Sequence, residues 1–215
     1  MIIHILSLFP ESIRPYLESS IMKRAQEKGL FQYHLHNLTD WTVRNTRRVD
    51  GRPYGWGAGT IITIEPLTRA LRAIQEEYGT MHIIYFSPRG KVLEQKMCQE
   101  FSQKWENSII ICGHYEGIDE RIFELFEIEE ISLWDYVLSS GELASLVWID
   151  SVVRLIPWVL SSESLLEESF STELGGKKEY PQYSRPENFQ WKTVPEVLLS
   201  GDQKKIREWN HGHTR

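Results

Sequence analysis

The chain has 215 residues, of which 41% are hydrophobic and 25% charged, and its formal net charge is −6. This length is enough for one large domain, or for one domain with a small appendage, without staples from disulfides. The acidic balance argues against a general nucleic-acid coat protein, and no run approaches the roughly 18 apolar residues of a membrane span.

Strand-like and helix-like patterns alternate along most of the chain. In order they predict a strand at 2–9, a helix over 13–25, a strand at 31–38, a long loop at 39–59, a strand at 60–65, a helix over 67–78, a strand at 82–87, a helix over 93–105, a strand at 108–112, a short helix at 118–126, a strand at 129–133, and an apolar helix over 142–156 that ends at Pro157. Such alternation implies parallel crossovers, so we expect an α/β fold with a mainly parallel sheet and helices on both faces.

The last quarter of the chain has a different character. Residues 161–180 show little periodicity and are expected to be a flexible linker, while 194–209 are expected to form one or two short helices. We therefore divide the chain into a main domain at 1–160, the linker, and a small helical piece at 181–215. Residues 177–215 carry eight Lys and Arg against five Asp and Glu, which leaves the rest of the chain at about −9.

The cysteines and the N-terminus bear on the compartment. Cys98 and Cys112 are the two cysteines, and their spacing favours neither a disulfide framework nor a cysteine zinc site. The opening run is apolar but has no basic leader or small-residue cleavage site, so we expect no signal peptide. Together these features indicate a reducing cytoplasm.

Polar and glycine-rich segments follow three of the predicted strands. They are Ser87–Gly90, Gly113–Gly117 and Asp135–Glu142. In open parallel sheets, ligands bind beyond the carboxyl ends of the strands, so these segments predict a shared pocket. The alternative is that they are ordinary turns. The chain contains neither a dinucleotide fingerprint nor a P-loop motif.

The amino-acid sequences of these segments point to a family more specifically than their spacing does. The chain reads LSLFPE at 6–11, VDGRPYGWGAG at 49–59, YFSPRG at 85–90, CGHYEGIDERI at 112–122, DYVLSSGEL at 135–143, IDSVVRLIP at 149–157, YPQYSRPE at 180–187 and TVPEVLLSGDQKKIREW at 193–209. In this order, and over nearly the whole chain, these motifs closely resemble the bacterial tRNA (guanine-N1)-methyltransferases of the SPOUT class.

The resemblance implies a fold and an activity. The fold is an α/β domain with a deep C-terminal trefoil knot, followed by a small helical tRNA-binding domain that is shortened here. The implied cofactor is S-adenosylmethionine, with magnesium as a helper ion although no acidic cluster marks a metal site. The implied partners are tRNA and a second copy of the chain, with no membrane and no DNA. The implied reaction methylates N1 of guanine 37, next to the anticodon, when another guanine precedes it.

The resemblance also assigns a cofactor pocket. Its expected residues are Tyr85, Phe86, Ser87, Pro88, Gly113, Tyr115, Glu116, Gly117, Leu133, Trp134, Asp135, Tyr136, Val137, Leu138 and Gly141. Backbone groups there can bind the adenine edge, and Glu116 can face the cationic part of the cofactor. An alternative for Tyr115 and Tyr136 is that they are core aromatics.

Methylation of guanine N1 needs a base near N1 and a positive or hydrogen-bonding group near O6. The family arginine falls on Arg154 and the family base on Glu168, where glutamate replaces aspartate; a second family aspartate falls on Glu179. The alternative for Arg154 is a helical ion pair with Asp150, and for both glutamates an exposed position in a linker.

Basic residues are candidates for contacts with tRNA phosphates. They are Arg44, Arg47, Arg48, Arg52, Arg185 and Lys192, and Glu179 is grouped with them on the substrate side. The alternative for the four arginines of the first group is a solvated loop.

Four tryptophans stand where the family has glycine: Trp56, Trp134, Trp158 and Trp191. Glycine serves where the backbone takes a positive φ or approaches a ligand, which tryptophan does poorly. One hypothesis is a gene in which UGA encodes glycine but was translated as tryptophan; UGG at these codons would exclude it. The alternatives are a non-catalytic tRNA-binding paralogue whose pocket Trp134 blocks, and a SPOUT enzyme with another RNA target.

Overall fold

The computed structural model describes residues 1–55, 57–104 and 106–214. It divides into two compact units, Met1–Val159 and Leu160–Arg215. Trp56, one of the four glycine positions, and Trp105, the last residue of a predicted helix face, lie outside the described residues.

The first unit contains most of the secondary structure. Its elements are β1 (Ile2–Ser7), η1 (Pro10–Ser12), α1 (Arg14–Leu17), α2 (Ser20–Glu27), β2 (Gln32–Asn37), η2 (Leu38–Trp41), β3 (Asp50–Gly51), β4 (Ile61–Ile62), α3 (Ile64–Tyr78), β5 (His82–Val92), α4 (Gln95–Lys104), β6 (Ser108–Ile111), α5 (Ile122–Leu125), β7 (Ile128–Ser132) and α6 (Gly141–Val153). Among the described residues, no helix is long and apolar enough to cross a membrane.

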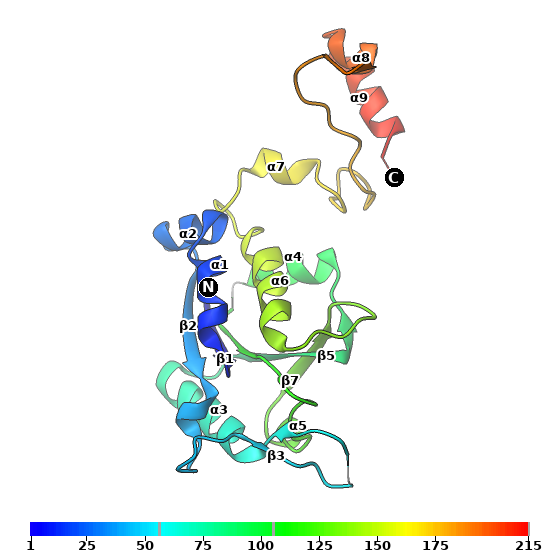
Figure 1. The fold of residues 1–215 in the computed structure, drawn as a ribbon. Coiled ribbons are helices and arrows are strands. Elements are labelled where there is room, and N and C mark those ends of the chain that lie inside the picture. Colours follow the sequence, from blue (N-terminus) through cyan, green and yellow to red (C-terminus); the bar gives the residue numbers. More distant parts are fainter. Residues whose placement is uncertain (56, 105, 215) are drawn as a thin grey trace. The chain divides into compact units, whose positions relative to one another are not determined.

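Five strands form one sheet in the order β2-β1-β6-β5-β7, and every neighbouring pair is parallel. Isoleucine dominates the central strands, which are buried on both faces, as parallel strands in α/β proteins are. Helices α1, α2, α4 and α6 cover one face, and α3 and α5 cover the other (Figure 1). The predicted parallel sheet with helices on both faces is confirmed.

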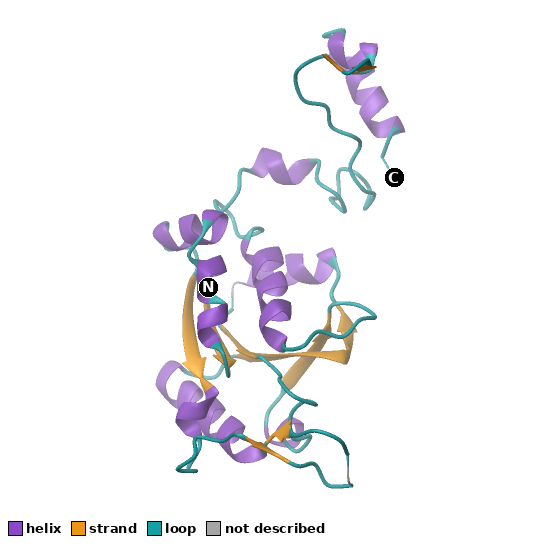
Figure 2. Ribbon diagram, viewed as in Figure 1, coloured by secondary structure: helices purple, strands orange, loops and turns teal. Residues whose placement is uncertain are grey.

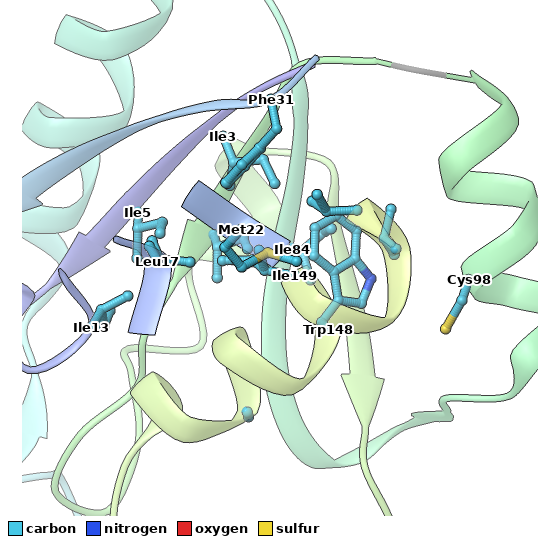
Figure 3. Packing of buried hydrophobic residues seen from close by; sticks show 14 of the residues in the cluster. Ile3, Ile5, Ile13, Leu17, Met22, Phe31, Ile84, Cys98, Trp148 and Ile149 are labelled. Atoms are coloured by element: carbon cyan, nitrogen blue, oxygen red, sulfur yellow. The ribbon is translucent and has the colours of Figure 1, made fainter. Parts of the chain in front are cut away.

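Trp148 is at the centre of the packing on the α6 side of the sheet. Its side chain is fully buried, and its ring meets Phe101 of α4 edge-on at a centroid distance of 5.1 Å. Figure 3 shows Trp148 among aliphatic side chains from the strands and from α2, including Ile84 and Met22. This tight packing holds α6 firmly on the sheet, and α6 begins at the candidate pocket described below.

Three predicted elements differ from the structure. The expected helix over 13–25 is broken into α1 and α2, because Ser20 takes a left-handed φ of 45°. The expected strand at 60–65 is reduced to β4, since α3 already begins at Ile64. Strand β5 continues through Pro88 and Gly90, which the sequence analysis treated as a loop, with a bulge between Phe86 and Lys91.

The second unit contains α7 (Ser162–Leu166), β8 (Asn188–Phe189), β9 (Lys192–Thr193), α8 (Glu196–Leu199) and α9 (Gln203–Gly212), which confirms the two predicted short helices. The stretch between α7 and β8 has neither helix nor strand (Figure 2). It is nevertheless hydrogen-bonded: Phe170 N donates to Lys177 O at 2.8 Å, and Gly176 N donates to Ser171 O at 3.0 Å. Part of the expected linker is therefore a closed turn.

Two of the unusual tryptophans have backbone conformations that favour glycine. Trp158 has φ 74° and Trp191 has φ 66°, and their side chains are 79% and 93% exposed. A side chain in the left-handed region carries a steric cost of about 1–2 kcal/mol, and an exposed indole recovers little of it by packing. These two positions fit glycine better than tryptophan.

Trp158→Gly should stabilise the chain by about 0.5–1 kcal/mol, because the relief of left-handed strain exceeds the added entropy of the unfolded state. The hydrogen bond from Lys28 Nζ to the Trp158 carbonyl, at 2.8 Å, uses the backbone and is kept. Urea unfolding measures the change. Trp134→Gly is the control, because Trp134 is not among the positive-φ residues; equal stabilisation of both variants would contradict the strain argument.

Three histidines stack on the α3 side of β1 and β2. His4 is 1% exposed, its Nδ1 lies 3.0 Å from His36 Nε2, and its ring stacks on His34 at 4.9 Å. Tyr78 at the end of α3 packs on the same ring at 4.4 Å. Burial, followed by the charges of His36 and His34, lowers the pKa of His4 to about 4. The folded chain therefore holds His4 in its neutral form.

Neutral His4 makes the fold sensitive to acid. In the unfolded chain, His4 takes up its proton near pH 6.5. The contribution of neutral His4 to the free energy of unfolding is therefore complete above that pH and falls as the pH drops toward 4. At pH 5 the loss is about 2 kcal/mol. Urea unfolding of His4→Phe at pH 7.5 and 5.0 should show a smaller pH dependence than the parent chain. Identical pH dependence, with exposed His211→Phe as control, would contradict this account.

Candidate active site

One pocket lies beyond the carboxyl ends of β6 and β7 and beside the bulge of β5, at the start of α6. Its volume is about 250 Å³, close to the lower end of the usual range for ligand sites. Of the residues expected to bind the cofactor, all but Asp135 line it: Tyr85, Phe86, Ser87, Pro88, Gly113, Tyr115, Glu116, Gly117, Leu133, Trp134, Tyr136, Val137, Leu138 and Gly141. The three segments predicted to share a pocket do so.

The parallel sheet brings these segments together, because its strands all end at the same edge. Close backbone packing then joins two of the segments. Gly141 N donates to Gly113 O at 2.8 Å, and a methyl group on Gly141 would lie 2.7 Å from Gly113 N and 2.8 Å from Cys112 Cα. Glycine at 141 is therefore required for α6 to start directly on the end of β6.

His114, Ser139 and Ser140 also line the pocket and lie within the segments predicted to share it. Three lining residues lie outside those segments: Ile131, Ser132 and Ala144. Ile131 and Ser132 directly precede Leu133, so extending that motif by two positions would have found them. Ala144 has a different signal, because it lies one helical turn beyond Gly141 on the same face of α6.

The pocket favours a cationic ligand with apolar parts. Among its described lining residues, Glu116 is the single acidic one, and there is no lysine or arginine. Aromatic rings of Tyr85, Tyr115 and Tyr136 line the walls. Burial, with a smaller contribution from Glu130, raises the pKa of Tyr85 to about 12, so its hydroxyl stays protonated. Tyr115 and Tyr136 are both exposed, so the alternative that they are core aromatics is wrong.

Trp134 lines the pocket and is 61% exposed, and the cavity beside it still has a volume of about 250 Å³. The hydroxyl of Ser132 donates to the Trp134 carbonyl at 3.4 Å. The pocket stays open with tryptophan at this position, which weakens the alternative in which Trp134 closes it.

Residues 42–52, here called the basic loop, carry the four arginines of the first candidate group. Arg48 Nε donates to Asp50 Oδ1 at 2.7 Å, and Arg44 Nη1 donates to the Asp50 carbonyl at 3.0 Å. Arg47 pairs with Asp40. All three side chains are exposed and each also has an acceptor in the chain, so the alternative of a solvated loop stays open beside the phosphate-binding one. Arg52 is exposed.

The remaining candidates are divided between the two units. Arg154 caps the C-terminus of α6 in the first unit. Glu168, Glu179, Arg185 and Lys192 are in the second unit, and the last three are exposed or nearly so. Within that unit, Ser169 Oγ accepts a hydrogen bond from Glu179 N at 3.0 Å and donates to Glu179 Oε2 at 3.4 Å. This contact closes the turn directly beside Glu168.

No group of three or more histidine, cysteine, aspartate or glutamate side chains suited to a metal ion occurs among the described residues. Cys112 is buried beside Ser145, 3.1 Å from its Oγ, and burial raises the pKa of its thiol well above the ordinary value. The cysteine therefore packs behind the pocket and does not act as a nucleophile.

The fold and the pocket together define an open parallel α/β protein with a ligand site at the strand ends. Comparison with known proteins defines the family. The model of the tRNA (Guanine-1)-methyltransferase TrmD family matches residues 1–215. The chain belongs to this family. The match covers the whole chain, so it favours neither a non-catalytic paralogue nor a methyltransferase of another class.

Individual relatives agree with the family match. A tRNA (guanine-N(1)-)-methyltransferase of Clostridioides difficile is 48% identical over 96% of this chain and 89% of its own length. The enzyme of the same name from Carboxydothermus hydrogenoformans is 50% identical over 97% and 81%. The crystal structure of tRNA (m1G37) methyltransferase from Aquifex aeolicus matches with a TM-score of 0.82 at 36% identity, over 99% of this chain and 88% of that one.

Gly141→Ala should destabilise the chain by about 1–3 kcal/mol, because the added methyl group meets backbone that cannot move aside. Gly212→Ala in α9 is the control: nothing lies within 4 Å of an added methyl group there, and alanine favours the helix. Thermal unfolding measures both. A Gly141→Ala chain as stable as the parent would show that the contact between α6 and β6 is loose.

Proposed function

We propose that the chain transfers the methyl group of S-adenosylmethionine to N1 of guanine 37 in tRNAs where another guanine precedes it. Family membership supports the reaction class. The observation that carries the proposal is the pocket itself, because one cavity gathers nearly all the residues expected to bind the cofactor.

The pocket chemistry fits S-adenosylmethionine. The carboxylate of Glu116 complements the positive charge of the cofactor, and the aromatic walls suit its adenine and sulfonium groups. Backbone groups of Gly113 to Gly117 and of Leu133 to Leu138 are available to the adenine edge. When bound, the cofactor supplies an electrophilic methyl group; binding and orientation are the work of these residues.

Glu168 is proposed as the general base and Arg154 as the group that stabilises charge on O6. Guanine N1 must lose its proton, and the electron pair left there spreads toward O6. Glu168 follows α7 and directly precedes Ser169, whose hydroxyl holds Glu179. The turn is also held at Tyr180, whose hydroxyl donates to Glu167 Oε2 at 2.6 Å. The side chain of Glu168, which is one methylene longer than the family aspartate, therefore extends from a hydrogen-bonded turn.

Phosphate contacts are proposed for the basic loop and for the second unit. Arg44, Arg47 and Arg48 are already oriented by acceptors of the same loop, so they can bind RNA with less loss of side-chain entropy. Arg52 in the first unit, and Glu179, Arg185 and Lys192 in the second, are the other residues proposed to contact tRNA. A local basic surface on an acidic chain binds tRNA without acting on nucleic acid in general.

We further propose that the chain works as a homodimer through the outer stripe of α6. Leu143 and Val147 are 56% and 47% exposed and lie one turn apart. Phe9 and Val137 add exposed apolar surface in the same unit. An exposed apolar stripe on a helix whose other side is buried against its own sheet favours burial by a partner.

Three further expectations stay predictions that follow from the family. They are the trefoil knot in the main domain, the cytoplasmic location of an enzyme that acts on tRNA, and the helper role of magnesium. Division into a main domain at 1–160, a flexible linker at 161–180 and a tRNA-binding piece at 181–215 is proposed on the same ground.

Glu168→Gln should lower the rate of methyl transfer by a factor of about 10²–10⁴, because the amide cannot take the N1 proton. Cofactor affinity should stay unchanged. Single-turnover methylation of a tRNA with guanines at 36 and 37 measures the rate. Glu163→Gln in α7, which replaces an exposed glutamate five residues earlier in the chain, should have the parent rate. A full rate for Glu168→Gln would remove this residue from the chemistry.

Leu143→Arg should convert the dimer into a monomer, since a charge in the middle of an apolar interface is costly. Leu125→Arg is the control, because Leu125 is also exposed but lies on α5, on the opposite face of the sheet. Sedimentation velocity distinguishes the two states. A parent chain that sediments as a monomer at micromolar concentration would refute the proposed interface.

A further inference from the structure

A buried carboxylate connects the start of α6 to the end of β1. Glu142, the second residue of α6, is 6% exposed, and its Oε1 accepts a hydrogen bond from Ser7 Oγ at 2.5 Å. Ser7 is the last residue of β1 and is fully buried. Strand β1 pairs with β6, on whose end α6 begins. The Glu142 side chain therefore joins the helix to a second strand, beside the one that Gly141 already contacts.

The same serine hydroxyl holds the turn that follows β1. Phe9 N donates to Ser7 Oγ at 2.8 Å. The ring of Phe9 then packs on the ring of His114, with their centroids 5.2 Å apart, and His114 lines the pocket. A chain of contacts thus leads from Glu142 through the end of β1 to the pocket wall.

The contacts return to Glu142 through the pocket wall itself. His114 directly follows Gly113, whose carbonyl accepts a hydrogen bond from Gly141 N at 2.8 Å, and Gly141 directly precedes Glu142. The result is a closed cycle of bonds and contacts through Ser7, Phe9, His114, Gly113, Gly141 and Glu142. Gly113, His114 and Gly141 line the pocket, while the other three members support them without lining it.

A carboxylate is a costly group for this connection. Its donor is a neutral hydroxyl, and its second oxygen, Oε2, is buried without a hydrogen-bond partner among the described residues. Burying a charge with incomplete hydrogen bonding destabilises a fold, although the N-terminus of α6 offsets part of that cost. An unpartnered buried oxygen calls for a reason other than stability. The contact cycle offers one, because it sets the spacing of the pocket wall.

We propose that Glu142 is a positioning residue for the cofactor pocket, whose hydrogen bond to Ser7 fixes the wall formed by Gly113, His114 and Gly141. This rests on the proposed function, in which that wall binds S-adenosylmethionine. Glu142 and Ser7 act through the wall residues, since neither lines the cavity. The expected signature is a loss of cofactor affinity without a matching loss of stability.

The test replaces Glu142 by methionine and is made without tRNA. Methionine is unbranched and about as long as glutamate, cannot accept the bond from Ser7, and carries no buried charge. The midpoint of thermal unfolding should therefore stay within about 4 °C of the parent value. Hydrogen exchange of the Gly141 amide, measured by NMR without cofactor, should become at least tenfold faster relative to Val152 in the same helix. The Kd of S-adenosylmethionine, measured by calorimetry, should rise at least fivefold.

Three further variants complete the test. Ser7→Ala removes the same hydrogen bond from the other side and should speed exchange at Gly141 at least tenfold. Glu142→Gln keeps an acceptor oxygen for Ser7 and should keep this exchange within threefold of the parent rate. Ser102→Ala is the control: Ser102 is also a buried serine, but its hydroxyl donates to Gln99 O within α4, at 2.8 Å. It should change the exchange and the Kd less than twofold.

The readouts separate the possible failures. Parent-like exchange at Gly141 in Glu142→Met and Ser7→Ala overturns the positioning role. Equal acceleration at Gly141 and Val152 would also overturn it, as would failure of both variants to fold, because the bond would then serve the fold as a whole. If the parent chain binds no S-adenosylmethionine, the proposed cofactor fails, while the exchange still tests the link from Glu142 to the pocket wall.

Discussion

The contact of Gly141 with the end of β6 is the constraint on which the candidate site depends. The two backbones approach so closely that no side chain fits between them, and a hydrogen bond from Gly141 to Gly113 holds them together. This contact fixes where α6 begins. The chain between β7 and α6 lines the cavity together with residues 85–88 of β5 and the segment that follows β6. Further along α6, buried Trp148 packs the same helix against the sheet.

The net charge of the chain says little about its sites, because the pocket and the basic loop each have their own local arrangement of charged side chains. The net charge is −6, yet the pocket has a single acidic residue among its described lining residues, and Arg44, Arg47 and Arg48 of the basic loop each have an acceptor. Such pairs contribute little to stability when they are exposed. What they do fix is the direction of the arginine side chains, which the proposed contacts with an RNA backbone require. An enzyme of tRNA can thus remain acidic overall.

The sequence patterns that predicted correctly were long and strongly apolar. The isoleucine-rich β1 and β6 and the apolar α6 were expected within a few residues, and the parallel sheet followed from their alternation. The expected pocket followed in turn, because parallel strands end at one edge. The particular cofactor and base came from the family motifs, since turns rich in glycine have many uses.

The elements that the sequence pattern did not predict have no periodic arrangement of apolar residues. Strand β3 has two residues, too short for any alternation, so its pairing with β4 was hidden in the loop expected at 39–59. The break at Ser20 is a left-handed conformation without a glycine to mark it. Proline and glycine within β5 indicated a turn, whereas the bulge absorbs them into the strand.

The left-handed φ at Trp158 and Trp191 agrees with glycine at these positions. Trp134 lines the pocket, so the effect of tryptophan there on cofactor binding bears directly on the proposed site. Calorimetric titration of S-adenosylmethionine into the chain, beside Trp134→Gly, is therefore the most direct test of the central claim. The account predicts micromolar binding to the parent chain and binding at least as tight to Trp134→Gly. Absence of binding to both would contradict the assignment of this pocket to the cofactor.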